Sequence, residues 1–224
     1  MLKLENVTQT YQVGRTQVTA LDNVNLLLEA GEFCAMVGES GSGKTTLMHI
    51  MGLLATPSAG RYTLCGQDVF ALKNGGRSRL RAAHIGFVFQ DFFLNPRLTA
   101  RENVELPLRL AGIAQSERRR MAEEALDKVG LADRMQHLPR ELSGGQQQRV
   151  AFARATVRHP ALILADEPTG NLDKRSTESI LSLLREENRR GATIFMITHD
   201  LSAAAAAGRV LTMEQGHITS DRLL

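Results

Sequence analysis

Residues 38–45 read Gly-Glu-Ser-Gly-Ser-Gly-Lys-Thr, and no other stretch restricts the fold of this chain as strongly. They match the pattern G-x-x-x-x-G-K-[ST], a loop whose backbone N–H groups surround phosphate groups. An apolar run of strand length, residues 33–37, precedes the loop, and residues 45–51 after it have helical propensity and end at Gly52. A strand, a glycine loop and a helix in this order aim backbone N–H groups and a helix N-terminus at an anion. The sequence therefore predicts a binding loop for a nucleoside triphosphate.

Backbone and side chains of this loop contribute differently to holding phosphate groups. Its three glycines permit the positive φ angles and the close backbone approach that the loop needs. Lys44 supplies a positive charge for the β- and γ-phosphates, and the Thr45 hydroxyl is a ligand for Mg²⁺. A chance match with both flanking elements occurs in about one chain in a thousand at ordinary residue frequencies. The nucleotide-binding residues predicted here are Gly38, Glu39, Ser40, Gly41, Ser42, Gly43, Lys44, Thr45 and Thr46.

Length and composition restrict the class of protein without indicating a function. A chain of 224 residues can bury a full core as one domain, or as one domain with a sizeable insertion. Its net charge of +3 argues neither for nor against nucleic acid. The apolar runs are too short to span a bilayer, and the N-terminus lacks a signal-peptide pattern. Cys34 and Cys65 lie in apolar, strand-like stretches, so we expect buried thiols without a disulfide, and a cytosolic protein.

Alternating residues before the phosphate loop predict a small antiparallel β subdomain beside the nucleotide. Residues 2–7, 17–21 and 24–28 are typical of strands, and residues 22–23 predict a tight turn between the last two. Tyr11 is one of only two tyrosines, and the chain has no tryptophan, so few rings are available to stack on a base. A half-buried aromatic residue at a strand end is the structural alternative for Tyr11.

A further strand ends in a glutamine. Residues 61–64 are typical of a strand, and residues 71–82 of a short surface helix. Residues 85–89 predict a buried strand that ends at Gln90. The carboxyl end of such a strand is where open α/β sheets bind ligands. An ordinary loop residue is the alternative interpretation of Gln90.

From residue 91 to about residue 155 the pattern changes from strands to helices. Residues 101–110 predict one helix, and Ser116 is a good N-cap for the next. The charged run at 117–120 is typical of a solvated helix face rather than of an anion site. We therefore predict a helical insertion between strands of one sheet.

The sequence Leu-Ser-Gly-Gly-Gln at residues 142–146 precedes another predicted helix, which extends to Arg158. Ser143 is a natural N-cap, and two glycines at the start of a helix expose N–H donors to an anion. This segment is therefore a second predicted phosphate-binding element. Because the first loop already surrounds the phosphates of one nucleotide, two such elements need either two nucleotides or two chains.

Polar residues end the next two buried strands. Residues 162–166 end in Asp166, which is placed to hold Mg²⁺ through water. Glu167 lies one residue further, where a base would polarise a water for attack on the γ-phosphate. A helix is predicted at 176–189, and the strand after it ends near His199, which can hydrogen-bond a γ-phosphate. A polar strand end without a catalytic role is the alternative in each case, and the phosphate loop weighs against it for the two acids.

When residues 142–146 are considered together with the other motifs, the whole chain resembles the ATP-binding cassette (ABC) ATPases. The phosphate loop, the glutamine, the helical insertion, Leu-Ser-Gly-Gly-Gln, Asp-Glu and the late histidine occur in the family's order. The resemblance implies ATP and Mg²⁺, and an α/β P-loop NTPase fold with a mainly parallel core sheet. It also implies an N-terminal antiparallel β subdomain and an inserted α-helical subdomain in a single domain. Residues 1–90 and 156–224 would form the RecA-like core with the β subdomain, and residues 91–155 the helical insertion.

The resemblance also implies roles for individual residues. Tyr11 matches the aromatic residue that stacks on adenine. Gln90 matches the glutamine that touches Mg²⁺ and senses the membrane subunit. Glu167 matches the catalytic glutamate, Asp173 the loop aspartate and His199 the switch histidine.

Two ATPases of this family dimerise head to tail, and each ATP lies between the phosphate loop of one chain and residues 142–146 of the other, the signature segment. The resemblance therefore implies that Ser143, Gly144, Gly145 and Gln146 serve the nucleotide of a partner. One complete set of motifs makes a homodimer with two competent sites the simplest assembly.

Within the family, residues 87–94, 102–108 and 165–173 resemble the lipoprotein-releasing and macrolide-efflux ATPases and their cell-division relative. The chain has no fused membrane domain, so we expect a separate permease and a peripheral location on the cytoplasmic side of a bacterial inner membrane, without a nucleic-acid partner. The implied function is ATP-driven dimer closure that powers an export or lipoprotein-release permease. The alternative is a regulatory ATPase that acts on cell-envelope enzymes. Residues 92–94 are either permease contacts or core of the helical insertion.

Overall fold

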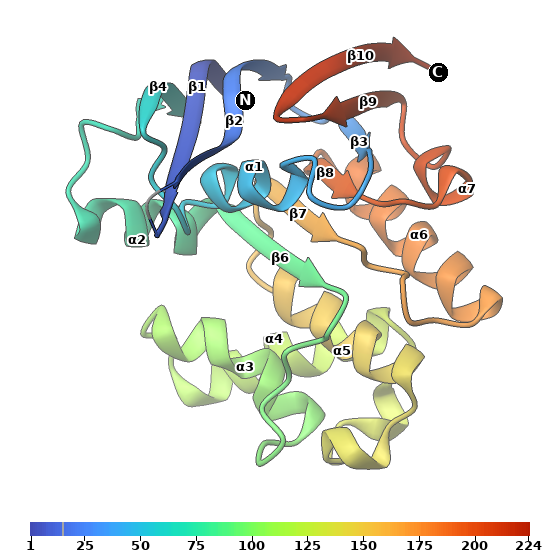
Figure 1. Ribbon diagram of the computed structural model, residues 1–224. Helices are drawn as coiled ribbons and strands as arrows, with labels where there is room; N and C mark the ends of the chain where they lie inside the picture. Colours follow the sequence, from blue (N-terminus) through green and yellow to red (C-terminus); the bar gives the residue numbers. More distant parts are fainter. Residues whose placement is uncertain (15) are drawn as a thin grey trace.

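The computed structural model describes residues 1–14 and 16–224, and Figure 1 shows two β-sheets with helices around them. The larger sheet consists of β3 (Phe33–Val37), β6 (Ile85–Phe89), β7 (Leu162–Asp166), β8 (Thr193–Ile197), β9 (Arg209–Glu214) and β10 (His217–Leu223). Its strand order is β10-β9-β3-β8-β7-β6. All neighbouring pairs described in this sheet are parallel except β9 with β10. The predicted α/β fold with a mainly parallel core sheet is confirmed.

The carboxyl ends of four parallel strands meet at one edge of this sheet. The phosphate loop follows β3 and leads into α1 (Lys44–Met51). Gln90 directly follows β6, Glu167 directly follows β7, and His199 comes shortly after β8. The topology therefore gathers polar residues that lie far apart in the sequence.

The smaller sheet is antiparallel and has the strand order β2-β1-β4-β5. It consists of β1 (Leu2–Val13), β2 (Thr16–Leu28), β4 (Ala59–Leu64) and β5 (Gln67–Asp68). The antiparallel β subdomain before the phosphate loop is confirmed.

The tight turn predicted between Leu21 and Val24 is wrong, because β2 passes through this point as one strand. The partners of Leu21 and Val24 on β1 are Gln9 and Val7, so β2 holds one residue more than β1 between these pairs. A β-bulge with Asn23 at φ 51° takes up the extra residue. Pairing with β1 on both sides of the bulge keeps the strand continuous.

Three longer helices lie together below the larger sheet in Figure 1: α3 (Ala100–Leu110), α4 (Gln115–Lys128) and α5 (Gly144–Thr156). Two 3₁₀ turns, Ala132–Arg134 and Pro139–Glu141, connect α4 to α5. α3 packs against both α4 and α5, and α5 also contacts β6 and α6 (Lys174–Arg189). α5 is therefore the main connection between this helical block and the core.

Ser116 is not the N-cap of α4, contrary to the sequence prediction. The helix begins at Gln115, and Ala114 occupies the N-cap position without a side-chain hydrogen bond. The Arg118 N–H already donates to the Ala114 carbonyl at 2.9 Å, which places Ser116 inside the first turn. Backbone geometry after the preceding turn therefore outweighed the capping preference of serine.

Two further helix boundaries differ from the prediction. α5 ends at Thr156, two residues before Arg158. α6 begins at Lys174 rather than Ser176, because Asp173 is its N-cap and accepts a hydrogen bond from the Ser176 N–H at 2.9 Å.

The charged run on α4 is a solvated face, as predicted. The Arg119 guanidinium pairs with Glu123 at 2.8 Å, and that of Arg120 pairs with Glu117 and Glu124 at 2.6 Å each. All five side chains in these pairs are exposed over more than a third of their surface. The arginines are therefore neutralised by neighbours on their own helix.

Two further helices lie outside the helical block. α2 (Asn74–His84) begins three residues later than the predicted surface helix and ends directly before β6. α7 (Leu201–Ala204) is short, and the Asp200 side chain caps it by accepting from the Ser202 N–H at 2.8 Å.

The larger sheet separates two hydrophobic cores, because successive side chains on a strand face opposite sides. On β3, Cys34 and Met36 enter the core that α1 and the smaller sheet complete. Phe33 and Ala35 enter the core formed with the helical block. Both thiols are free, with Cys34 buried and Cys65 half-buried.

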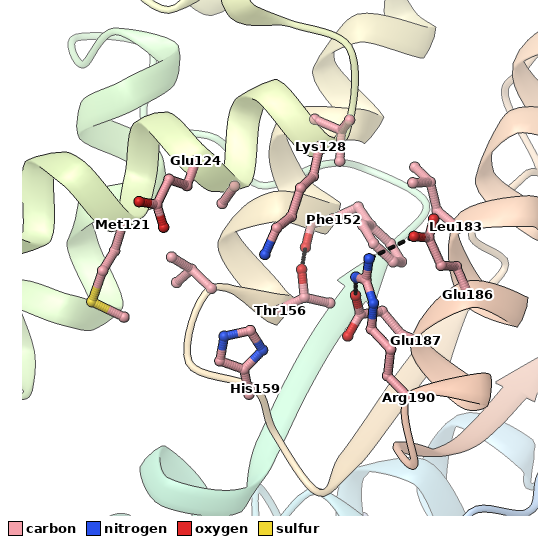
Figure 2. A pocket seen from close by; sticks show the side chains of 13 residues that line it. Met121, Glu124, Lys128, Phe152, Thr156, His159, Leu183, Glu186, Glu187 and Arg190 are labelled. Carbon is pink, nitrogen blue, oxygen red and sulfur yellow. Dashed lines mark hydrogen bonds and ion pairs between the residues drawn. The ribbon is translucent and has the colours of Figure 1, made fainter.

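A small hollow with a volume of about 50 Å³ lies where α4 and α5 meet α6. Figure 2 shows Lys128 and His159 facing into it, while Arg190 turns to Glu186 and Glu187. Both Arg190 hydrogen bonds measure 2.5 Å. Charged groups therefore line this seam between the helical block and the core.

Candidate active site

Gly43 sets the geometry at the start of α1. It is the N-cap residue with φ 109°, and no side chain caps the helix. A Cβ at this position would lie 2.5 Å from the carbonyl oxygen of Ala20 on β2. A Cβ at Gly41 would instead meet nothing within 4 Å. The first-turn N–H groups of α1 therefore have no side-chain cap, and open space lies beside the loop for a ligand.

Lys44 lies inside the loop that it helps to form. The residue is buried, and its Nζ donates to the carbonyl oxygens of Gly38 at 2.8 Å and Glu39 at 2.6 Å. Burial lowers the pKa of the Lys44 ammonium, while the carboxylates of Glu167 and Asp166 act in the opposite direction. The positive charge that the loop carbonyls hold in place is suited to binding an anionic ligand.

Asp166 and Glu167 stand side by side at the end of β7. Burial raises the pKa of Asp166, and the adjacent Glu167 raises it further, whereas His49 and Lys44 lower it. Glu167 has φ 45°, a left-handed conformation that is strained for a residue with a Cβ. Its N–H donates to the Ile197 carbonyl at 2.9 Å, which ties the end of β7 to the end of β8.

Glu167 and His199 form a pair across these two strands. Oε1 of Glu167 lies 2.9 Å from Nδ1 of His199, whose side chain is 73% exposed. Oε2 of Glu167 is buried and meets no hydrogen-bond donor among the described residues. A carboxylate with one buried, unpaired oxygen is available to accept a hydrogen bond from a bound water or ligand.

Gln90 faces the loop that follows Glu167. Its Nε2 donates to Oδ1 of Asn171 at 3.1 Å. A Cβ at Gly170 would lie 3.1 Å from the Gln90 amide, so a larger residue there would press on it. Neither Asn171 nor Gly170 was predicted from the sequence as a partner of Gln90.

These side chains share one pocket with a volume of about 410 Å³. Its lining residues are Ala20, Gly38, Ser40, Gly41, Gly43, Lys44, Thr45, Thr46, Gln90, Asp166, Glu167, Ile197 and His199. Ala20 and Ile197 were not predicted, because apolar residues on a strand carry no signal that they border a site. Glu39 and Ser42 border the neighbouring pocket on the outer side of the loop.

The signature segment does not line this pocket. Ser143 caps α5, and it and Gln146 exchange reciprocal hydrogen bonds in a capping box. Ser143 and Gly144 are exposed, while Gly145 lies against Ser176. The second predicted phosphate-binding element therefore lies outside the pocket that contains the first.

Tyr11 and Asp173 also lie outside the pocket. Tyr11 is paired with Val18 in the β1–β2 ladder and is 43% exposed. Asp173 caps α6, and hydrogen bonds from the Ser176 N–H and hydroxyl lower the pKa of its carboxyl. Both side chains are accessible to a ligand or a partner.

The pocket fits the phosphates of a nucleoside triphosphate and a magnesium ion. The loop offers uncapped helix N–H groups, the Lys44 charge and the open space beside Gly41. The oxygen atoms of Thr45, Gln90 and Asp166 are of the type that Mg²⁺ prefers, and few protein ligands suffice because Mg²⁺ retains several waters.

Comparison with known proteins decides the family. The family described as ABC transporter matches residues 21–170, more than half of the chain. The chain belongs to the ABC transporter ATPases. It is 51% identical over 221 residues to the ABC transporter ATP-binding protein YvrO of Bacillus subtilis, described as uncharacterized, covering 99% of this chain and 96% of YvrO.

Two further similarities support this assignment. The macrolide export ATP-binding/permease protein MacB of Burkholderia pseudomallei is 48% identical over 223 residues. That match covers 100% of this ABC ATPase but only 34% of MacB. A dimeric structure of the ATP-binding cassette MJ0796 in a post-hydrolysis state, bound to ADP and Pi, matches with a TM-score of 0.94 and 42% identity. It covers 100% of this chain and 99% of that one.

These similarities confirm the resemblance to the ABC ATPases and to their macrolide-efflux subgroup. The chain is an ATP-binding ATPase component of a transporter. Within residues 1–14 and 16–224, no helix combines the length and the apolar character needed to cross a membrane.

Proposed function

We propose that two copies of this ABC ATPase close head to tail around two ATP molecules and so drive a separate membrane permease of the export or lipoprotein-release type. One observation carries the proposal: the pocket has a phosphate loop and the two carboxylates Asp166 and Glu167, yet the signature segment lies outside it, with Ser143 and Gly144 exposed. A second copy is the simplest source of the missing element. MJ0796 is described as dimeric, which supports the pairing of two copies. The name of MacB supports an export-type permease, although MacB combines the ATP-binding and permease functions in one protein. YvrO, of which this chain covers 96%, is described as an ATP-binding protein alone, which supports a separate permease.

The residues of the pocket take distinct roles in this proposal. The phosphate loop and Lys44 bind the phosphates of ATP, and Tyr11 stacks on the adenine. Thr45, Gln90 and, through water, Asp166 would hold Mg²⁺, which neutralises charge on the phosphates when bound. The signature residues of the partner complete the site: Ser143, Gly144, Gly145 and Gln146. Asp173 lies in the loop before α6, where it would face the partner.

Glu167 and His199 organise the attack of water on the γ-phosphate. Oε2 of Glu167 is free to accept a proton from that water, while Oε1 stays with His199. The products are ADP and phosphate, and most of the acceleration comes from positioning and charge stabilisation. Because ATP lies between two chains, its binding favours the closed dimer and its hydrolysis favours opening.

A second surface suits the permease. A groove with a volume of about 600 Å³ lies between β6, α2 and α3, beside the segment that follows Gln90. Its lining includes the apolar side chains of Phe87, Phe89 and Leu106 and the basic side chains of Arg79 and Arg81. We infer that a helix of the permease, exposed on the cytoplasmic side of the membrane, binds here. The ATPase would then be peripheral to the inner membrane through this contact alone.

Glu167→Gln tests the catalytic part of the proposal. The substitution keeps size and polarity but removes the base, so we expect ATP binding to persist and turnover to fall about 10²- to 10⁴-fold. A sizing column should show a dimer with ATP and a monomer without it. Hydrolysis at the normal rate would contradict the role of Glu167. Lys44→Ala is the matched variant, and it should instead weaken ATP binding itself.

Isolation of the protein from detergent-solubilised membranes tests whether it binds a membrane subunit. We expect a membrane subunit to co-purify, and substrate movement by the reconstituted complex on addition of ATP. A complex that hydrolyses ATP and moves no substrate would favour a regulatory ATPase that acts on cell-envelope enzymes.

A further inference from the structure

The segment after Gln90 has an unfavourable backbone conformation. Phe92 and Phe93 have φ angles of 35° and 46°, in the left-handed region that bulky residues avoid. The Phe93 N–H donates to the carbonyl of Asp91, which closes a tight turn. A turn of this kind persists only where neighbouring groups hold it in place.

Arg154 on α5 holds this turn. Its Nη1 donates to the Phe93 carbonyl at 2.5 Å, and its Nη2 donates to the Phe92 carbonyl at 2.8 Å. One guanidinium thus binds both residues that have the unfavourable angles. Burial lowers the pKa of Arg154, and no carboxylate pairs with it among the described residues. Its hydrogen bonds go to the turn.

Gln148, six residues earlier on α5, binds the backbone on the N-terminal side of Gln90. Its side chain is fully buried, and Nε2 donates to the Phe89 carbonyl at 3.1 Å and to the Pro168 carbonyl at 2.6 Å. Phe89 directly precedes Gln90, and Pro168 directly follows Glu167. The same helix therefore contacts the backbone on both sides of Gln90.

The N-terminus of α5 also touches this turn. A Cβ at Gly144 would lie 3.8 Å from Cζ of Phe92, so the Phe92 ring rests beside the signature segment. The Phe93 ring packs edge-on against Phe89 at 5.2 Å between centroids. The turn is thus held between α5 and β6.

We propose that Arg154 is a positioning residue that holds the Phe92–Phe93 turn and thereby keeps Gln90 directed at the magnesium ion, with Gln148 fixing the preceding residue. The inference rests on the proposed role of Gln90 as a magnesium ligand. It makes α5 one rigid element that begins at the signature segment and determines the position of Gln90. A shift of the signature segment would then alter the position of Gln90 in the same chain.

Proteolysis of the nucleotide-free and metal-free chain tests the first step. Chymotrypsin cleaves after Phe92 or Phe93 only when the turn opens, so Arg154→Ala should speed this cleavage several-fold. Arg77→Ala is the matched control, because Arg77 also donates to a backbone carbonyl, that of Val69 at 3.2 Å, but lies on α2. Cleavage at the wild-type rate in Arg154→Ala would overturn the proposal.

ATP affinity with Mg²⁺ and with EDTA tests the second step. For Arg154→Ala we expect an unchanged affinity in EDTA and a loss of about tenfold with Mg²⁺, the equivalent of one polar contact. Arg154→Lys, which can reach one carbonyl, should recover part of the lost affinity. This recovery would show that the loss in Arg154→Ala does not come from a folding defect. The double variant with Gln90→Ala should bind no more weakly than Gln90→Ala alone, because both changes remove the same contact.

Two outcomes would overturn the inference. Equal losses with and without Mg²⁺ would make Arg154 a general stabilising residue, and additive losses in the double variant would separate it from Gln90. Failure of the proposed function is a different result, since it would show as normal hydrolysis by Glu167→Gln and would leave these binding measurements as they are.

Discussion

At the scale of single residues, the glycines of the phosphate loop differ in what they contribute. Gly43 is restricted on two counts, by φ 109° and by the carbonyl of Ala20 next to it. Gly41 has φ 79° but open space around it. Gly43 is needed by the fold itself, and Gly41 leaves room for the ligand. The pattern G-x-x-x-x-G-K-[ST] requires glycine at position 43 and leaves position 41 open, and the structure supplies the physical reason.

Gly43→Ala and Gly41→Ala separate these contributions. We expect Gly43→Ala to lower the free energy of unfolding by about 3 kcal/mol through backbone strain and overlap with Ala20. Gly41→Ala should cost only about 1 kcal/mol of strain, but it should weaken ATP binding because the new methyl group enters the pocket. Urea unfolding and titration with a nucleotide analogue measure the two effects. Equal losses of stability would contradict the assignment.

The two thiols also differ. Burial raises the pKa of Cys34 to about 12 and also raises that of the half-buried Cys65. Since the thiolate is the reactive form, roughly one Cys34 in 10⁴ is ionised at pH 8. We expect a thiol reagent to label Cys34 only after denaturation, and Cys65 earlier. Mass spectrometry of the labelled peptides checks this, and labelling of native Cys34 within minutes would contradict it.

At the scale of elements, the start of α3 shows how a helix terminus can organise a loop. Thr99 and Glu102 form a capping box. Asn103 is fully buried, and its side chain binds the backbone of Asn95, Leu98 and Thr99 through four hydrogen bonds. This one side chain therefore fixes the loop between the Phe92–Phe93 turn and α3. Buried asparagine is uncommon, and its partners could not be read from the sequence.

The capping box makes part of the stability dependent on pH. Hydrogen bonds from the Thr99 N–H and hydroxyl lower the pKa of Glu102. Its stabilising contribution is therefore complete above the ordinary glutamate pKa and is lost as the pH falls through the lowered value. Glu102→Gln should reduce Tm by a few degrees at pH 7 and by less at pH 3. Glu178→Gln, on the exposed side of α6, is the control, and a pH-independent difference would contradict the argument.

At the scale of the whole molecule, the larger sheet places the phosphate loop, the carboxylate pair and His199 at one edge, while the helical block holds the signature segment apart. This separation makes a single chain an incomplete site in the proposed dimer. It also predicts which pairs of defective chains can complement one another.

Mixed dimers test this arrangement. Lys44→Ala removes the phosphate-loop charge, and Gly144→Asp places a carboxylate at the exposed start of α5, where a Cβ meets only ordinary contacts. Each variant alone should be inactive. A mixture should regain up to about a quarter of the activity, because half of the dimers are mixed and each of these has one intact site of two. No recovery, with mixed dimers present, would contradict the head-to-tail assembly.

The sequence by itself determined the elements and their order: the phosphate loop, the strand ends at Gln90 and Asp166, and the capped helix at Ser143. These features depend on local backbone geometry and on the period of apolar residues, which short segments encode. The start of α4 and the bulge at Asn23 could not be predicted in this way, because neighbouring backbone geometry and pairing outweighed local preference.

Only the tertiary structure decided which of these residues meet. It placed Oε1 of Glu167 beside His199, brought Ala20 into the wall of the pocket, and set Arg154 on the Phe92–Phe93 turn. It also left the signature segment outside the pocket that the phosphate loop lines in its own chain. The physical reason is that such contacts join segments far apart in the sequence. Sheet pairing and core packing fix them, and no local pattern records them.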